Sequence, residues 1–214
     1  MEIEGLAEVL APQVADSLDV VGLRDQVMDA AIQPVQPGLR ALGPAVTIEF
    51  EPADDFDDDD PYGDLIEALD SLEPGVVVVI STSSYEASGL WGELFSAAAM
   101  GRGAAGVVID GCSRDTPQVR GLGFPVFAKG QKPLDYKGRQ RVVRRDVPIR
   151  CGNVVVCPGD WVMADDDGVV VVPEGRAEEV LEIAAARVRG ETTVRDELIS
   201  GDTIRTVWER HGIL

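Results

Sequence analysis

Arg114 and Asp115, two neighbouring residues near the middle of the chain, carry groups that could bind and activate a small anion. The guanidinium of Arg114 is a planar fork of N–H donors that suits a carboxylate or an enolate oxygen, and the Asp115 carboxylate is a hard ligand suited to Mg2+. Residues 92–95 are expected to lie in the first turn of a helix, where N–H groups without a partner inside the helix can receive a carboxylate. These three features together describe a site for a small anionic keto acid.

The helix that carries this turn is expected to begin near Ser88, its cap, and to stop at Gly101 and Gly103. Apolar residues recur here at every fourth position, which predicts a helix with one broad apolar face. Glycine most easily adopts the left-handed conformation that ends a helix. The recurring residues are Leu90, Leu94 and Ala98, with Trp91 and Phe95 beside them.

Buried strands are expected on both sides of this helix. Residues 76–82 read as the earlier strand and residues 105–109 as the later one, with Asp110-Gly111 beginning the next loop. A strand, a helix and a second strand form a right-handed parallel unit, and catalytic groups in such sheets gather beyond the carboxyl ends of the strands. This arrangement predicts that residues 83–93 and 111–115 lie at the same edge of the sheet.

The remaining sequence predicts an α/β domain with a mixed sheet, because parallel units are followed by short strands with tight turns. Alternating apolar residues mark residues 45–50 as the first core strand, and residues 165–168 read as a hairpin turn in preference to a metal site. We expect one domain over residues 1–190 and a C-terminal helical extension over residues 191–214. Further helices are expected at 6–18, 64–72, from Thr116-Pro117, 174–189 and 192–199, with 203–210 helical or frayed; further strands are expected at 124–128, 154–157, 161–164 and 169–172.

The formal charge of −19 limits the partners of this 214-residue chain. Nucleic acid requires a basic face and anionic membranes attract one, so we exclude both as partners. An acidic surface of this kind stays soluble at high ionic strength, where self-repulsion is screened. We therefore expect a halophilic source, with an acidic protein from an organism with a GC-rich genome as the alternative.

Other features of the composition are interpreted structurally. No apolar run approaches the roughly twenty residues of a membrane span, and the acidic N-terminus lacks the basic start of a signal peptide, so we expect a cytoplasmic protein. The three cysteines lack metal-ligand spacing and are expected to be reduced. The aspartate tract at 54–60 is expected to be a solvated loop, and the basic span 129–145 to pair with carboxylates of this or a neighbouring subunit. The lone His211 is expected to be exposed and inert.

Four segments, which read GLWGEL, GAAGVVIDGCSRD, FPVFAKG and PGDWVMADDDGVVVVP, give the chain a family resemblance. Between about Val14 and Ser200 the sequence resembles the family of the regulator of ribonuclease activity A, which includes divalent-metal 4-hydroxy-4-methyl-2-oxoglutarate aldolases that also decarboxylate oxaloacetate. The resemblance implies an α/β sandwich of the swivelling type, a trimer or hexamer with its sites between subunits, and Mg2+ or Mn2+ as cofactor.

The resemblance also implies a role for each residue of the expected site. Asp115 would be the metal ligand and Arg114 would contact the substrate oxygens. The N–H groups of Leu94 and Phe95, beside Gly92, would bind the substrate carboxylate. A glutamate from the C-terminal helix of the neighbouring subunit would complete the site, and Glu191 matches it best, with Glu197 as the alternative.

Glu93 departs from the pattern of the aldolases, which have aspartate there, twenty residues before Arg-Asp. Glutamate keeps the acid but is longer by one methylene group, so we expect it to act in proton transfer from a shifted position. The structural alternatives are an ordinary helix-start acid for Glu93 and a loop ion pair for Arg114 and Asp115. Two functions remain: a metal-dependent pyruvate aldolase or oxaloacetate decarboxylase, and a metal-free interaction protein. Asp115 favours the enzyme, because a pure binder has no use for a metal ligand.

Overall fold

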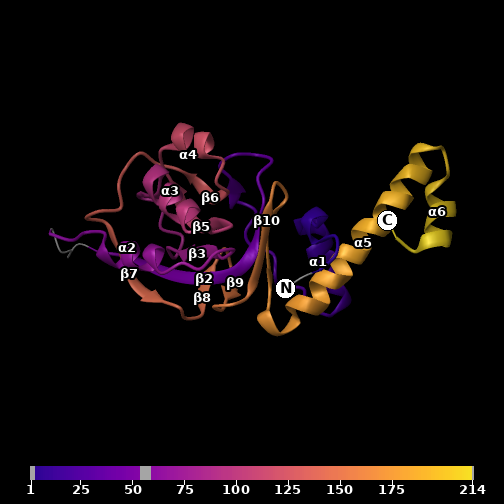
Figure 1. Cartoon of the computed structure of the whole chain (residues 1–214), viewed down its shortest axis with the longest axis horizontal. Coiled ribbons are helices and arrows are strands. Elements are labelled where there is room, and N and C mark those ends of the chain that lie inside the picture. Colours follow the sequence, from indigo (N-terminus) through magenta and orange to yellow (C-terminus); the bar gives the residue numbers. More distant parts are fainter. Residues whose placement is uncertain (1–2, 54–58, 214) are drawn as a thin grey trace.

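The computed structural model describes residues 3–53 and 59–213, so residues 54–58 of the aspartate tract lie outside the described residues. Figure 1 shows a compact α/β body from which a helical arm projects. The strands are β1 Gln33–Pro34, β2 Ala41–Pro52, β3 Val77–Ser81, β4 Gly89–Trp91, β5 Gly106–Ser113, β6 Val126–Gln131, β7 Gln140–Arg145, β8 Ile149–Cys151, β9 Val154–Val156, β10 Trp161–Asp165 and β11 Gly168–Val172. The helices are η1 Leu6–Glu8, α1 Ala11–Val20, α2 Gly63–Asp70, α3 Glu93–Gly101, α4 Thr116–Leu122, η2 Glu174–Arg176, α5 Ala177–Ile199 and α6 Ile204–His211.

A mixed sheet, nine-stranded within the described residues, forms the centre of the body, as the sequence predicted. Its path runs β1-β6-β5-β3-β2-β10-β11, with β4 paired to β5 and β7 paired to β2. Strands β2, β3, β5 and β6 are parallel, whereas β1, β7, β10 and β11 join antiparallel. The carboxyl ends of β3, β5 and β6 therefore meet at one edge of the sheet, where the candidate site lies.

Different elements cover the two faces of this sheet. Helices α2, α3 and α4 lie on one face and the β8–β9 hairpin on the other (Figure 1). The helical side buries one apolar cluster, which includes Leu65, Leu69, Ile80, Ala99, Ile109 and Val119. The hairpin side buries a second cluster, which includes Ile149, Cys151, Val156, Val77, Val79 and Val108. The central strands are apolar on both faces because both faces are covered.

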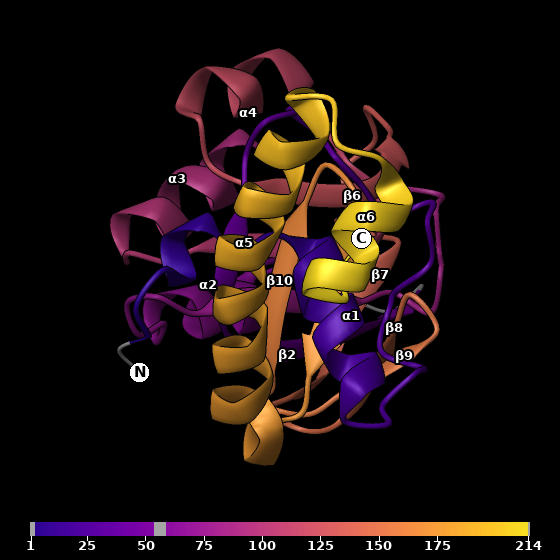
Figure 2. The same ribbon diagram turned by 90° about the vertical axis from the view of Figure 1, so that its right-hand side faces the viewer.

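Helices α1 and α5 pack together against the β10–β11 end of the sheet (Figure 2). Helix α5 is continuous, whereas the sequence predicted two pieces that separate near Gly190. A glycine inside a helix costs only about 1 kcal/mol, which the packing on both sides outweighs. A Cβ atom at Gly190 would lie 2.7 Å from Ile213 Cδ1, so glycine here leaves room for the end of the chain. Among the described residues no helix is both long and apolar enough to cross a bilayer.

The turn between β10 and β11 confirms the hairpin prediction. Asp165 Oδ1 accepts a hydrogen bond from Asp167 N–H at 2.9 Å, and Asp165 Oδ2 accepts one from Ala11 N–H at 2.7 Å at the start of α1. Asp166 accepts a hydrogen bond from Gly38 N–H. The carboxylates of Asp165 and Asp166 therefore join the turn to α1 and to the loop before β2. These hydrogen bonds are a sufficient reason for aspartate at both positions.

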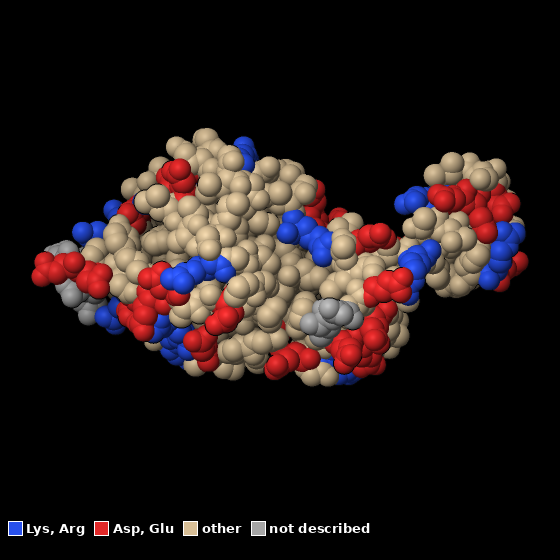
Figure 3. All heavy atoms as spheres, in the orientation of Figure 1, with Lys and Arg blue, Asp and Glu red and all other residues tan. Residues whose placement is uncertain are grey.

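The basic span also behaves as predicted, because its cations pair with carboxylates of the same chain. Pairs join Lys129 to Asp29, Arg144 to Glu49 and Arg145 to Glu67. On the face shown in Figure 3, acidic and basic side chains lie interspersed at the tip that carries α2 and β7 and along the arm. The three cysteines Cys112, Cys151 and Cys157 are free thiols, and burial raises the pKa of each.

Candidate active site

The junction between β4 and α3 forms the first wall of the site, and it corrects the prediction for this stretch. Residues 89–91 are strand β4, so helix α3 begins at Glu93 with Gly92 as its N-cap and not near Ser88. Leu94 and Ala98 are exposed, whereas Ser96 and Ala99 face the core. The apolar residues at every fourth position predicted the wrong start for the helix. Leu90 belongs to a strand, in which side chains alternate with a period of two.

A buried serine fixes the position of this junction. Ser96 Oγ accepts a hydrogen bond from Trp91 Nε1 at 2.8 Å and donates one to Gly92 O at 2.9 Å. The backbone of β4 is therefore joined to the first turn of α3 by a side chain with no exposed surface. The N–H groups of Leu94 and Phe95 lie in this first turn, where helix geometry offers them no intrahelical acceptor. The turn can therefore receive an anion, in the place where the sequence predicted it.

Arg114 and Asp115 follow β5, which is longer than expected because Asp110 and Gly111 continue the strand to Ser113. The backbone N–H of Arg114 donates to Trp91 O at 2.8 Å and so holds the loop beside β4. Asp115 adopts the left-handed conformation, with φ 54° and ψ 37°, which aspartate tolerates better than most residues. Its Oδ2 accepts a hydrogen bond from Glu93 N–H at 3.2 Å. The helix start at residues 92–95 and the Arg-Asp loop, both predicted from the sequence, thus meet at the Asp115 carboxylate.

Gly92 is required at this point because the loop approaches too closely for a side chain. A Cβ atom added at Gly92 would lie 2.3 Å from Asp115 Oδ2 and 3.0 Å from Arg114 Cγ. The backbone of Gly92 is extended, with φ −140°, so the requirement is for space and not for a left-handed conformation. The absence of a side chain therefore allows the carboxylate to rest against the helix start.

Two further residues, Asp135 and Tyr62, belong to the site and were missed in the sequence. Arg114 Nη1 pairs with Asp135 Oδ2 at 3.1 Å, and Arg114 Nε lies 3.5 Å from Asp115 Oδ2. The Tyr62 hydroxyl donates to Asp135 Oδ2 at 2.6 Å. Asp135 could have been found, because it is an acid inside the basic span and follows β6, whose carboxyl end lies at the same edge. Tyr62 carried no such signal.

The surroundings of Asp135 keep it ionised. Burial alone would raise the pKa of the Asp135 carboxyl, but hydrogen bonds from the Tyr62 hydroxyl and Lys137 N–H and the charge of Arg114 outweigh it and lower the pKa. The same hydrogen bond raises the pKa of the Tyr62 hydroxyl, with burial as the second cause. At neutral pH the phenol is therefore a donor and the carboxylate an acceptor, and Arg114 faces a permanent negative charge.

The start of α3, the Arg-Asp loop and Tyr62 line one hollow of about 450 Å³. Its polar lining consists of the helix start, the guanidinium of Arg114 and the carboxylates of Glu93 and Asp115, and its apolar lining includes Ile66 and Phe95. A volume of this size accepts a small organic acid. The lining residues are Tyr62, Ile66, Gly92, Glu93, Leu94, Phe95, Arg114 and Asp115. All of the residues that the sequence predicted for this site, except the glutamate of the neighbouring subunit, therefore lie together.

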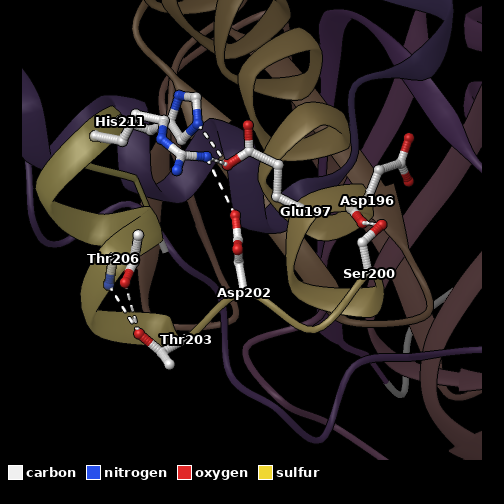
Figure 4. Close-up of polar contacts among 8 residues, drawn as sticks. Asp196, Glu197, Ser200, Asp202, Thr203, Thr206 and His211 are labelled. Atoms are coloured by element: carbon white, nitrogen blue, oxygen red, sulfur yellow. Dashed lines mark hydrogen bonds and ion pairs between the residues drawn. The ribbon is translucent and has the colours of Figure 1, made fainter.

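The two candidate C-terminal glutamates lie outside this hollow. Glu191 accepts hydrogen bonds from Arg187 Nε at 2.7 Å and Gln13 Nε2 at 2.8 Å, at the junction of α5 and α1. Glu197 lies on the arm, where Arg210 Nη1 and His211 Nε2 approach its Oε2 at 2.6 and 2.9 Å (Figure 4). His211 is therefore partly buried in a polar cluster, contrary to the prediction that it is exposed.

The donor set of the hollow fits Mg2+ and does not fit a metal with a full protein cage. Among the described residues no three His, Cys, Asp or Glu side chains converge on one point. Mg2+ keeps several waters and is often held by one or two carboxylates with the remaining positions left to substrate. Asp115, whose side chain is 38% exposed and whose carboxylate rests in the space beside Gly92, is a carboxylate of this kind.

Comparison with known proteins identifies the family. The model of the RraA-like family, described as Aldolase/RraA, matches residues 11–171. The chain belongs to the RraA-like family. The match begins at α1 and ends within β11, so it includes every element that lines the candidate site. The family prediction and the mixed α/β fold are thereby confirmed.

Relatives carry both kinds of name that this family contains. A protein of Halalkalibacterium halodurans, provisionally named a 4-hydroxy-4-methyl-2-oxoglutarate aldolase, is 30% identical over 89% of this chain and 85% of its own length. The crystal structure of Streptomyces coelicolor RraAS2, described as an unusual member of the RNase ES inhibitor RraA family, is 31% identical with a TM-score of 0.81 over 91% of this chain and 96% of that one. Protein DlpA of Legionella pneumophila is 27% identical over 97% of this chain, but the chain spans only 33% of its length.

Proposed function

We propose that this RraA-like protein is a divalent-metal-dependent lyase that releases pyruvate from a 4-hydroxy-2-oxo diacid, from oxaloacetate, or from both. The observation that supports the proposal is the convergence of Arg114, Asp115 and the first turn of α3 in one hollow. A loop ion pair alone would not need the anion-binding helix start beside it or the glycine that lets the carboxylate approach.

Each residue has a definite task in this reaction. The N–H groups of Leu94 and Phe95 bind the substrate carboxylate, and the guanidinium of Arg114 stabilises the keto oxygen as it gains negative charge. Asp115 holds the Mg2+ or Mn2+ ion, which when bound supplies Lewis-acid stabilisation of that charge. Cleavage of the C3–C4 bond leaves its electron pair on pyruvate as the enolate. In the aldol reaction the C4 hydroxyl becomes the carbonyl of the leaving aldehyde or ketone and gives its proton to the water beside Glu93, which returns a proton to the enolate carbon. In the decarboxylation carbon dioxide leaves, and the enolate carbon takes its proton from the same water.

Glu93 is the proposed proton donor to the enolate carbon. It lines the hollow and precedes the two N–H groups that bind the carboxylate, so its side chain starts close to the bound acid. A carboxyl acting through one water must lie within about 2.6–3.2 Å of that water. Because glutamate is longer than the aspartate of the aldolase pattern, we propose slow cleavage of the usual 4-hydroxy-4-methyl substrate, with decarboxylation or a differently shaped acid preferred.

The protein is further proposed to act as a trimer or hexamer in which a C-terminal glutamate enters the neighbouring site. Glu191 and Glu197 are paired with residues of their own chain, so each would have to exchange these partners to enter a neighbouring site. Both lie on α5, which leads into the arm. The arm also exposes Ile199, Ile204 and Trp208, which subunit contact would bury. Light scattering tests this assembly, and a monomer at micromolar concentration would remove the neighbour's glutamate from the mechanism.

The function is tested with purified protein and Mg2+ or Mn2+ on a panel of keto acids, with lactate dehydrogenase reporting pyruvate. The panel contains oxaloacetate, 4-hydroxy-4-methyl-2-oxoglutarate and other 4-hydroxy-2-oxo acids. We expect pyruvate from at least one of them. If no acid yields pyruvate above the uncatalysed rate, the alternative of a metal-free interaction protein, which the relationship to RraAS2 supports, replaces the enzyme.

A further inference from the structure

Arg114 is held between two carboxylates that lie on opposite ends of its guanidinium fork. Asp115 Oδ2 lies 3.5 Å from Nε, and Asp135 Oδ2 lies 3.1 Å from Nη1. A guanidinium that is held at two nitrogens has a defined plane, which matters because the fork binds carboxylates and enolates directionally.

Asp135 is itself positioned from the core. Its Oδ2 also accepts the 2.6 Å hydrogen bond from Tyr62, and its Oδ1 accepts a 3.1 Å hydrogen bond from Lys137 N–H. The Tyr62 ring packs edge-on against Tyr136 with centroids 5.4 Å apart, and Tyr136, only 2% exposed, packs in the same way against Phe50. A chain of contacts therefore runs from the core strand β2 to the guanidinium.

Backbone hydrogen bonds also hold the loop that carries Asp135. Gly89 N–H donates to Leu134 O at 2.7 Å, and Lys132 N–H donates to Ser113 O at 2.8 Å. These backbone bonds anchor the loop to β4 and β5 on their own. Removal of the Asp135 charge should therefore alter the orientation of the Arg114 side chain more than it alters the stability of the fold.

We propose that Asp135, held by Tyr62, is a positioning residue that sets the orientation of Arg114 toward the keto acid. The inference rests on the proposed function, since it assigns Arg114 to the substrate oxygens. An exposed ion pair contributes little, about 0–1 kcal/mol. The Arg114–Asp135 pair differs from such a pair because both side chains are only about 30% exposed. In addition, Asp135 Oδ2 accepts a hydrogen bond from the Tyr62 hydroxyl.

The test compares Asp135→Asn, Tyr62→Phe and a matched control, Asp70→Asn. Asp70 pairs with Arg102 at the same 3.1 Å distance, but on the surface between α2 and α3. Asp135→Asn should lower kcat/KM for the best keto acid by about tenfold to a hundredfold, because a misdirected group costs on that scale. Tyr62→Phe should lower it by about fivefold, the cost of one hydrogen bond. Asp70→Asn should leave it unchanged, and the melting temperatures of the Asp135 and Asp70 variants should agree within a few degrees.

A double-mutant cycle separates positioning from a general structural effect. If Asp135 acts through Arg114, then Asp135→Asn should cause little further loss in the Arg114→Lys background, where the fork is already absent. An equal fold-loss in both backgrounds, or no loss in the native background, would overturn the proposal.

Calorimetric binding of oxalate in the presence of Mg2+ distinguishes this proposal from the proposed function. If no keto acid yields pyruvate but oxalate binds, the proposed function fails while the positioning role is still measured. Asp135→Asn should then weaken oxalate binding about as much as Arg114→Lys does, and unchanged affinity would refute the role. If the native protein neither releases pyruvate nor binds oxalate, both proposals fail.

Discussion

Asp115 Oδ2 lies 3.2 Å from the backbone nitrogen of Glu93, so one carboxylate joins the Arg-Asp loop to the start of helix α3. Asparagine at position 115 would keep an acceptor for this N–H and tolerates the left-handed backbone, whereas alanine does neither. We predict that Asp115→Asn loses metal binding with little change in melting temperature. Asp115→Ala should also lose about 1–2 kcal/mol of folding free energy. Calorimetry measures the metal binding and thermal melting measures the stability. Equal melting temperatures for the two variants would contradict a stabilising role for the hydrogen bond between Glu93 N–H and Asp115.

Gly92→Ala should damage the site without straining the backbone. The new Cβ atom would lie 2.3 Å from Asp115 Oδ2, which forces the carboxylate away from the helix start. A displacement of about 1 Å can cost on the order of a hundredfold in rate, and we predict a loss of this size in pyruvate release together with weaker metal binding. The control is Gly101→Ala on the same helix, where no neighbouring atom lies within 4 Å. Steady-state assays should show normal activity for the control, and normal activity of Gly92→Ala would be inconsistent with the close approach.

Glu93 is tested by two substitutions that separate length from charge. Glu93→Asp restores the aldolase pattern and should raise turnover of the 4-hydroxy-4-methyl substrate while leaving metal affinity nearly unchanged. Glu93→Gln keeps the length but removes the acid, and should lower whatever activity the native protein shows. If Glu93→Gln is as active as the native protein, the residue is an ordinary helix-start acid and takes no part in proton transfer.

The Tyr62–Asp135 hydrogen bond should be visible in a tyrosine titration. Its effect, with burial, raises the pKa of Tyr62 above the ordinary value of 10.0, so the neutral phenol is favoured in the folded state. The resulting stabilisation is complete below pH 10 and is lost as the pH rises through the folded-state pKa. Asp135→Asn removes the negative charge and should bring the Tyr62 titration closer to pH 10. Near-ultraviolet absorbance follows tyrosinate formation, with Tyr62→Phe identifying the transition, and superimposable native and Asp135→Asn curves would argue against the coupling.

Local sequence signals were sufficient to predict the sheet edge but not the path of the chain through it. Arg114, Asp115 and residues 92–95 were placed together correctly, because the carboxyl ends of two parallel strands lie at the same edge of a sheet. The start of α3 was misplaced because Leu90 and Trp91 are equally apolar in a strand and in a helix. Only the pairing of Gly89 and Trp91 with β5, a tertiary contact, decides between them.

Long-range contacts also explain the residues that the sequence did not reveal. Tyr62 and Asp135 are 73 positions apart and meet only because β2, α2 and the loop after β6 converge at the same edge. The continuity of α5 through Gly190 depends on packing against α1 and the chain end, which no local propensity reports. The position of Glu191 relative to a neighbouring hollow depends on an assembly of several chains, so it remains a prediction.

The central claim is that Asp115 and Arg114 form a metal-dependent site that produces pyruvate. The most direct measurement is the rate of pyruvate release from oxaloacetate as Mg2+ is added to metal-stripped protein, with Asp115→Asn under identical conditions. The variant corrects for decarboxylation by free Mg2+, and it should remain folded because asparagine tolerates this backbone. We predict a saturable rise for the native protein, at least about a hundredfold above the variant at saturating Mg2+. Equal rates for the two proteins at every Mg2+ concentration would contradict the claim.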